Sequence, residues 1–100
     1  MNNKEKLQRI QAVKSQSKWR TCVERLGLFV KKCKNSHLTV WKNKEEAEEN
    51  NVQKMVATIQ KDIRPDVNEG IFDNLVEKSG KTEEEILRAV KILKGNDTVL

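Results

Sequence analysis

Long apolar runs, aromatic residues, proline and histidine are all scarce in this 100-residue chain. The longest apolar runs span three residues, as in Leu28-Phe29-Val30, which excludes a membrane-spanning helix of about 20 residues. Residues 1–6 lack the apolar stretch of a secretory signal, so we expect a cytoplasmic chain that does not engage a membrane.

Potential metal ligands are also few. The chain has two cysteines, Cys22 and Cys33, and one histidine, His37. Structural zinc usually takes four ligands, which these three side chains cannot supply. A disulfide is unfavourable in a reducing cytoplasm. We therefore expect no metal and no cofactor, and we expect both cysteines to be small buried side chains.

Positive charge is concentrated in the first part of the chain. Residues 1–42 hold eleven basic and two acidic residues, a net of +9, and the remainder holds nine basic and thirteen acidic, a net of −4. The sum is the formal +5 of the whole chain. Such asymmetry is typical of nucleic-acid contact, because each Lys or Arg that neutralises a phosphate releases counterions. A solvated helix face with a disordered basic tail would give the same count.

The length favours one domain. We expect residues 1–16 to form a flexible or partly helical basic extension, residues 17–95 to form the domain, and residues 96–100 to form a tail. Ser17 has the character of an N-cap, and the apolar residues that follow it recur at the spacing of a one-sided helix ending at Gly27.

Three short segments favour strands. Residues 28–33 and 37–42 are rich in β-branched and aromatic side chains and flank the turn Lys34-Asn35-Ser36. A third strand is expected within residues 53–60. The acidic segment between, residues 43–51, predicts a mobile loop.

Two helices are expected after Pro65. Asn68 is a candidate cap for a helix that ends at Gly80. Thr82 and Glu85 have capping-box spacing before a last helix that ends near Gly95. That helix presents an apolar face made of Ile86, Leu87, Val90 and Leu93.

The predicted fold is α+β, with a three-stranded antiparallel sheet, helices on one face and the order α-β-β-β-α-α. Alternation along the second strand places Leu38 and Val40 on the covered face. His37, Thr39 and Trp41 then lie on the opposite face, which has no obvious cover. We expect function on that face.

The surroundings of His37 favour chemistry on RNA. An imidazole can accept and return protons near neutral pH, and lysines can stabilise charge on phosphorus. An exposed tryptophan can stack on an unpaired base. The candidate catalytic residue is His37, and the candidate RNA-binding residues are Lys31, Lys32, Lys34, Ser36, Trp41 and Lys42. A lone histidine on a solvated, lysine-rich strand edge remains the alternative interpretation.

Three segments together resemble the HicA family of mRNA interferase toxins (YcfA-like). Lys34-Asn35-Ser36-His37-Leu38-Thr39-Val40-Trp41 resembles the glycine-serine-histidine segment that begins the family's second strand. Leu26-Gly27-Leu28-Phe29-Val30 resembles its link from first helix to first strand, and residues 70–85 resemble its later helix, glycine and acidic-capped turn. The resemblance covers residues 17–93, and its specificity lies in the order and spacing of short motifs.

The resemblance implies a fold like that of double-stranded-RNA-binding domains and cleavage of mRNA through the 2′-hydroxyl, without a metal. It also implies neutralisation by a HicB-like antitoxin protein, and a catalytic role for His37. Two features depart from the family pattern. Asn35 stands where the family has glycine, and the family's proline-arginine-histidine stretch after the third strand is replaced by Gln60-Lys61-Asp62-Ile63-Arg64.

Two other functions fit the same residues. A non-catalytic module could use the basic hairpin to bind structured RNA or DNA. A protein-interaction domain could dock a partner on the exposed sheet face around Trp41.

Overall fold

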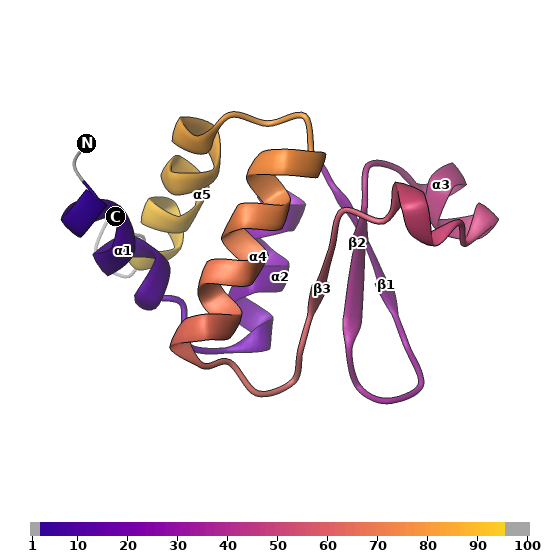
Figure 1. The fold of residues 1–100 in the computed structure, drawn as a ribbon, viewed down its shortest axis with the longest axis horizontal. Helices are drawn as coiled ribbons and strands as arrows, with labels where there is room; N and C mark the ends of the chain where they lie inside the picture. Colours follow the sequence, from indigo (N-terminus) through magenta and orange to yellow (C-terminus); the bar gives the residue numbers. More distant parts are fainter. Residues whose placement is uncertain (1–2, 96–100) are drawn as a thin grey trace.

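A computed structural model describes residues 3–95 of the chain. Figure 1 shows a helical layer beside a small sheet. The described elements are, in chain order, α1 (Asn3–Gln11), α2 (Gln16–Arg25), β1 (Phe29–Lys32), β2 (Leu38–Trp41), α3 (Lys44–Glu49), the 3₁₀ turn η1 (Val52–Lys54), β3 (Ala57–Ile59), α4 (Pro65–Lys78) and α5 (Glu83–Gly95). The predicted tail, residues 96–100, and the side chain of Leu93 lie outside the described part.

The strands form an antiparallel sheet in the order β1-β2-β3. Val30 is opposite Val40 in the first pair, and Leu38 is opposite Ile59 in the second. The predicted α+β class and three-stranded antiparallel sheet are confirmed. β1 and β3 are edge strands, so each has one side that is not paired within the sheet.

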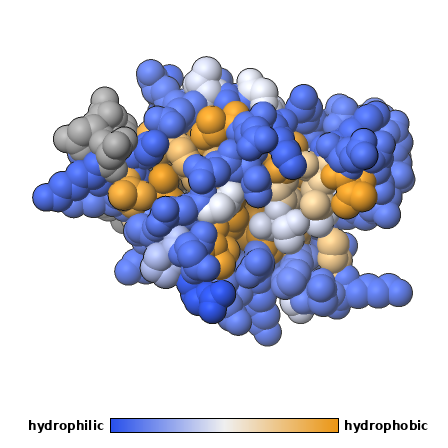
Figure 2. Space-filling model, in the orientation of Figure 1, coloured by the Kyte–Doolittle hydropathy of each residue, from blue (hydrophilic) through white to orange (hydrophobic). Residues whose placement is uncertain are grey.

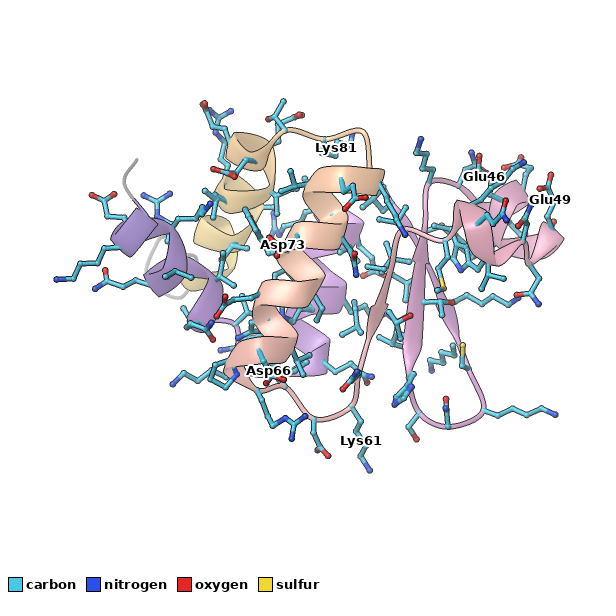
Figure 3. The ribbon with its side chains drawn as sticks, in the orientation of Figure 1. Glu46, Glu49, Lys61, Asp66, Asp73 and Lys81 are labelled. Atoms are coloured by element: carbon cyan, nitrogen blue, oxygen red, sulfur yellow. The ribbon has the colours of Figure 1, made fainter. Side chains whose placement is uncertain are left out.

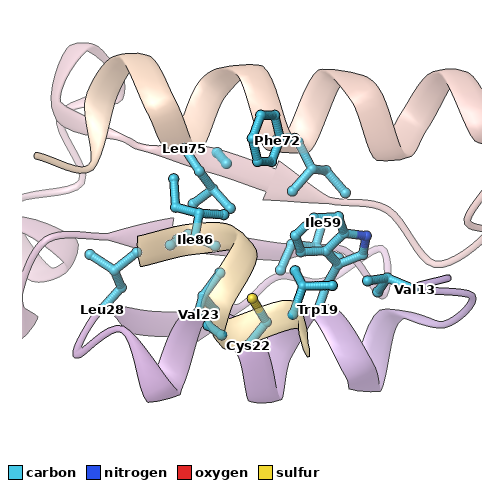
Figure 4. Close-up of a cluster of buried hydrophobic side chains, with 14 of the residues drawn as sticks. Val13, Trp19, Cys22, Val23, Leu28, Ile59, Phe72, Leu75 and Ile86 are labelled. Carbon is cyan, nitrogen blue, oxygen red and sulfur yellow. The ribbon is translucent and has the colours of Figure 1, made fainter. Parts of the chain in front are cut away.

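The main core lies between the sheet and the helices. α2 and α4 contact the sheet, and α5 packs against both of these helices. The side chains that fill this layer are apolar and almost wholly buried, and Figure 4 shows Trp19, Cys22, Val23, Ile59, Phe72, Leu75 and Ile86 among them. Burial of a large apolar side chain contributes about 1.5–3 kcal/mol, so this layer is the main source of stability.

Residues 1–16, predicted to form a flexible or partly helical extension, contain the helix α1, and this helix is packed onto the domain. α1 packs on α4 and α5, and Ile10 and Val13 are buried in the main core. Asn68, predicted as a helix cap, lies inside α4 and is buried. Its amide donates to Val13 O and Gln11 Oε1, so it fastens the segment after α1 to α4. The domain therefore includes residues that the sequence pattern assigned to an extension.

α4 begins at Pro65, not after Asn68. Proline suits the first helical position because its fixed φ is helical and the N–H it lacks would be unpaired there. The other helix boundaries agree closely with the sequence. Ser15, not Ser17, caps α2, and Gly27 and Gly80 take the positive φ expected after a helix. Thr82 and Glu85 exchange the two capping-box hydrogen bonds.

The predicted mobile loop at residues 43–51 contains α3. Asn43 caps this helix by accepting a bond from the Glu46 N–H, and Asn50 ends it in a left-handed conformation. Ala47 is buried. The Lys31 ammonium donates to Ala47 O at 3.2 Å and to Asn50 Oδ1 at 3.3 Å. These contacts order a segment whose acidic composition suggested disorder.

α3 covers part of the sheet face that was predicted to be open. Lys31, which reaches α3, lies opposite Thr39, and Phe29 lies opposite Trp41 on the same face. Trp41 is only 1% exposed, and its Nε1 donates to Thr39 Oγ1 at 2.9 Å. Helices therefore lie on both faces, α2 and α4 on one and α3 on the other (Figure 1).

Two further findings concern membranes and cysteines. No helix within residues 3–95 has the length and apolarity to cross a bilayer. Cys22 is buried as predicted, but Cys33 is exposed. Burial raises the pKa of the Cys22 thiol from its ordinary value of 9.0 to about 12.

Candidate nucleic-acid interface

The β1–β2 turn carries His37 at the end of the sheet farthest from α3. Cys33 N–H donates to His37 O, and Ser36 N–H donates to Cys33 O. Ser36 has a φ of 70°, which gives a three-residue loop that ends in a left-handed residue. The predicted turn at Lys34-Asn35-Ser36 is confirmed. However, Ser36 and not Asn35 occupies the position where glycine would be least strained.

Gln16, the first residue of α2, joins this turn to two other segments. Its Nε2 donates to Ser36 O at 2.8 Å and to Ile59 O at 3.1 Å. One side-chain amide thereby fixes the start of α2, the hairpin turn and the end of β3 side by side. We call this arrangement the Gln16 junction.

Lysines surround the Gln16 junction. Lys14, Lys18, Lys34 and Lys61 each lie within two residues of one of its three bonded residues, and all four are exposed. No carboxylate lies within two residues of Gln16, Ser36 or Ile59. The positive end of the α2 dipole is at the same place, and the first turn of α2 has no acidic residue. We refer to these four lysines together with His37 as the basic end.

Two acidic residues, Asp62 and Asp66, lie near Lys61, and other acidic side chains lie farther away. Figure 3 shows Glu46 and Glu49 on α3 and Asp73 on α4, while Lys61 lies below the sheet at the opposite end from α3. Not all of the basic residues gather at the basic end either. Lys6 on α1 pairs with Glu83 at 3.4 Å and lies over the Phe72 ring. Basic residues of the first part of the chain therefore lie on two surfaces, the basic end and the surface of α1.

His37 is half-buried beside the turn. Strand alternation directs it to the same face as Thr39, on the part of that face beyond α3. Among residues 3–95, no side chain hydrogen-bonds or pairs with its imidazole. Both ring nitrogens are consequently open to a ligand.

The structure separates the six predicted RNA-binding residues into three groups. Lys32, Lys34 and Ser36 are exposed near His37, as expected. Lys31 donates a hydrogen bond to α3. Trp41 is buried, so it cannot act as the exposed stacking platform that was predicted. Lys42 follows the other end of β2, about 17 Å along the strand from His37 at the usual rise per residue.

Metal ligands do not cluster in the described part of the chain. No group of three or more His, Cys, Asp or Glu side chains is close enough to hold an ion there. Cys33, which pairs with His37 through the backbone, has its Sγ 3.8 Å from Thr39 Oγ1. This end of the sheet offers hydroxyl, thiol, imidazole and ammonium groups.

Sequence reasoning missed Gln16, Lys14, Lys18 and Lys61. The three lysines are separated from the hairpin in sequence and become its neighbours only when α2 and β3 pack beside it. The one available signal was the charge of residues 14–18, Lys-Ser-Gln-Ser-Lys, directly before a predicted helix. A long-range bond from a glutamine amide to two backbone carbonyls has no sequence signature.

Comparisons with protein-family models, with curated proteins and with solved structures found no match in any of the three. The resemblance to HicA toxins and the likeness to double-stranded-RNA-binding domains therefore stay predictions.

Proposed function

We propose that this chain binds RNA through the basic end. The observation that carries the proposal is the Gln16 junction, which gathers Lys14, Lys18, Lys34 and Lys61 around three bonded residues that have no carboxylate within two positions in sequence. Exposed ammonium groups contact phosphates as point charges. Because the junction holds three segments together, the lysines keep their spacing before a ligand arrives.

The proposal makes binding dependent on salt. Four phosphate contacts to a single strand give a slope of about −3 in log K against log salt concentration. The experiment is fluorescence anisotropy with a labelled RNA, repeated from about 50 to about 200 mM salt. The double variant Lys34→Gln/Lys61→Gln should bind roughly tenfold or more weakly, with the slope reduced by about 1.4.

The matched control is Lys44→Gln. Lys44 is exposed at the start of α3, so this variant removes one positive charge without touching the basic end. Its affinity should stay within about twofold of the wild type at moderate salt, where distant charges are screened. Equal losses in the control and in Lys34→Gln alone would show that net charge, and not the basic end, determines binding.

A second candidate is cleavage of the bound RNA, favoured by the unpartnered His37 imidazole beside Lys34 and Ser36. The imidazole would take the proton of a 2′-hydroxyl, and the 2′-oxygen would bond to the adjacent phosphorus. The bond to the 5′-oxygen then breaks, leaving a 2′,3′-cyclic phosphate and a 5′-hydroxyl. Lys32 or Lys34, or water, would supply the proton to the 5′-oxygen. An ammonium is a weak acid near neutral pH, so we expect slow turnover.

Cleavage is tested with an RNA and a DNA of the same sequence. The wild type should cut only the RNA and leave cyclic phosphate ends, and His37→Ala should bind equally well without cutting. If both proteins cut, or if neither does, His37 is not the general base. The lysine variants test binding independently, so the non-catalytic function can stand if cleavage fails.

The physiological setting we propose is that of a cytoplasmic toxin of a type II toxin–antitoxin system, with mRNA as substrate and a HicB-like antitoxin as partner. Its support is the motif order around Ser36-His37. Expression of the wild type should arrest growth, and His37→Ala should relieve the arrest at equal protein levels. Growth arrest by both proteins would contradict a toxin that acts through His37.

A further inference from the structure

A groove runs between the edge strand β3 and α4, and one of its lining residues, Gln60, directly precedes Lys61 of the basic end. It has a volume of about 330 Å³. Its lining is mixed: the apolar residues Val52, Met55, Val56, Ala57, Val67 and Ile71 lie beside the polar residues Thr58, Gln60, Asp66, Asn74 and Lys78. In Figure 2, hydrophobic surface emerges between hydrophilic side chains over the gap between α4 and β3.

The groove is open because of Gly70. This residue lies on the α4 side of the groove, and a Cβ placed on it would meet no atom within 4 Å. Val52, on the opposite side, is 69% exposed. The chain therefore leaves an aliphatic side chain in solvent at the rim and provides no side chain to fill the space across from it.

The upper end of the groove is rich in lysine. A second hollow, of about 420 Å³, shares Met55 and Lys78 with the first and is also lined by Lys42 and Lys54. Glu46 and Glu77 line it as well. Lys54 pairs with Glu49 at 3.0 Å, whereas Lys42 and Lys78 form no ion pair with any residue in 3–95. These two ammonium groups can each receive a carboxylate.

We propose that this groove docks an extended segment of a partner protein, in which an aliphatic side chain is followed by an acidic residue. The aliphatic side chain occupies the space in front of Gly70, and the acidic residue pairs with Lys78 and Lys42. β3 is an edge strand, so backbone groups on its outer side can pair with an extended chain, although Ile59 O already accepts from Gln16 Nε2. This inference does not depend on the proposed RNA function.

The test uses a displayed library of random short peptides panned against the full chain. Enriched peptides are synthesised, and their affinity is measured by fluorescence anisotropy. We expect them to share a branched aliphatic residue next to Asp or Glu. Gly70→Leu, which fills the groove with a helix-favouring side chain, should weaken binding at least tenfold. Glu69→Leu is the matched control, because this exposed neighbour on α4 does not line the groove.

Lys78→Glu tests the charged end. Lys78→Glu should lower the affinity for the acidic peptides at least fivefold. Glu77→Gln should leave that affinity unchanged or raise it slightly. The inference is overturned if no peptide is enriched, if the enriched peptides lack acidic residues, or if Gly70→Leu and Glu69→Leu bind equally. RNA affinity measured on Gly70→Leu should equal that of the wild type, and competition by RNA for this groove would also contradict a peptide site.

Discussion

Asn68 shows how one polar side chain can organise a core. It accepts a bond from Trp19 Nε1 at 2.6 Å and donates to Gln11 Oε1 and Val13 O, both at 3.0 Å. The carbonyl oxygen and both N–H groups of the amide are used, and three segments of the chain meet at it. A buried amide of this kind stabilises only while every partner remains.

We predict that Asn68→Ala lowers the free energy of unfolding by about 3 kcal/mol, because Trp19 Nε1 and Val13 O lose their partner in the interior. Asn74→Ala is the control, since Asn74 is on the same helix, half-buried and without a hydrogen bond to described residues. Urea denaturation of the three proteins measures the difference. Similar losses for both variants would mean that the three bonds contribute little.

Cys22 makes stability fall at alkaline pH. Its thiol is neutral in the folded protein, with a pKa of about 12 against an ordinary 9.0, because the interior disfavours a thiolate. Between these values the unfolded chain releases a proton that the folded chain retains. The stabilisation is complete below pH 9 and is lost as the pH rises towards 12, with a slope of up to about 1.4 kcal/mol per pH unit.

Urea denaturation from neutral to alkaline pH tests this prediction. Other groups titrate in the same range, so the comparison is between Cys22→Ala, which should lose this part of the slope, and Cys33→Ala, which should keep it. Because Cys22 is buried and Cys33 is exposed, Cys33 should be the only thiol of the native protein that reacts quickly with an alkylating reagent. If the unfolding free energy of Cys22→Ala fell with pH as steeply as that of the wild type, the Cys22 thiol would not be the source of the pH dependence.

At the scale of elements, α3 depends on a cation at its C-terminal end. The Lys31 ammonium donates to Ala47 O in the last turn of α3, a carbonyl that also accepts from the Asn50 N–H at 3.1 Å, and a positive charge at this end of a helix is favourable. A helix of six residues has little stability of its own. Its position over Trp41 therefore rests on this contact and on the burial of Ala47.

Lys31→Met should loosen α3 without unfolding the domain. We expect amide hydrogen exchange in residues 44–50 to accelerate roughly tenfold, which corresponds to about 1.4 kcal/mol, and Trp41 fluorescence to shift to the red. Lys32→Met, which removes an exposed neighbouring charge, should change neither. Equal exchange in the two variants would show that Lys31 does not hold the helix.

The elements that the sequence predicted are those determined by local signals. The capping box at Thr82 and Glu85, the apolar period of α2 and the turn at Lys34-Asn35-Ser36 each act over a few residues. α3 escaped prediction because its order comes from a lysine 16 residues away that reaches Ala47. The site was predicted only in part for the same reason. Lys31 bonds to α3 and Trp41 is buried, so neither is available to a ligand, and the acidic composition of α3 had predicted disorder.

At the scale of the whole molecule, α1 closes the helical layer. Ile10 and Val13 are almost fully buried, and α1 contacts both α4 and α5. A pattern with one apolar residue per turn predicts a weak helix by itself. Only the assembled surface of α4 and α5, with Asn68 at its edge, makes this helix part of the domain.

Removal of residues 1–14 should therefore unfold most of the population. Loss of the two buried side chains costs about 3–6 kcal/mol, comparable with the total stability of a small domain. Circular dichroism melting and binding of a hydrophobic dye measure the effect. A truncated protein that melts within a few degrees of the full chain would restore the view of residues 1–16 as a dispensable extension.

Gln16 has a consequence for the dynamics of the hairpin. A hairpin loop usually moves on the nanosecond timescale, because only the strands restrain it. Here the Ser36 carbonyl is tied to the first turn of α2 and, through the same amide, to the end of β3. The loop must then move together with the helix, so ligand binding there would lose little conformational entropy, and backbone order parameters for residues 34–37 should match those of the strands.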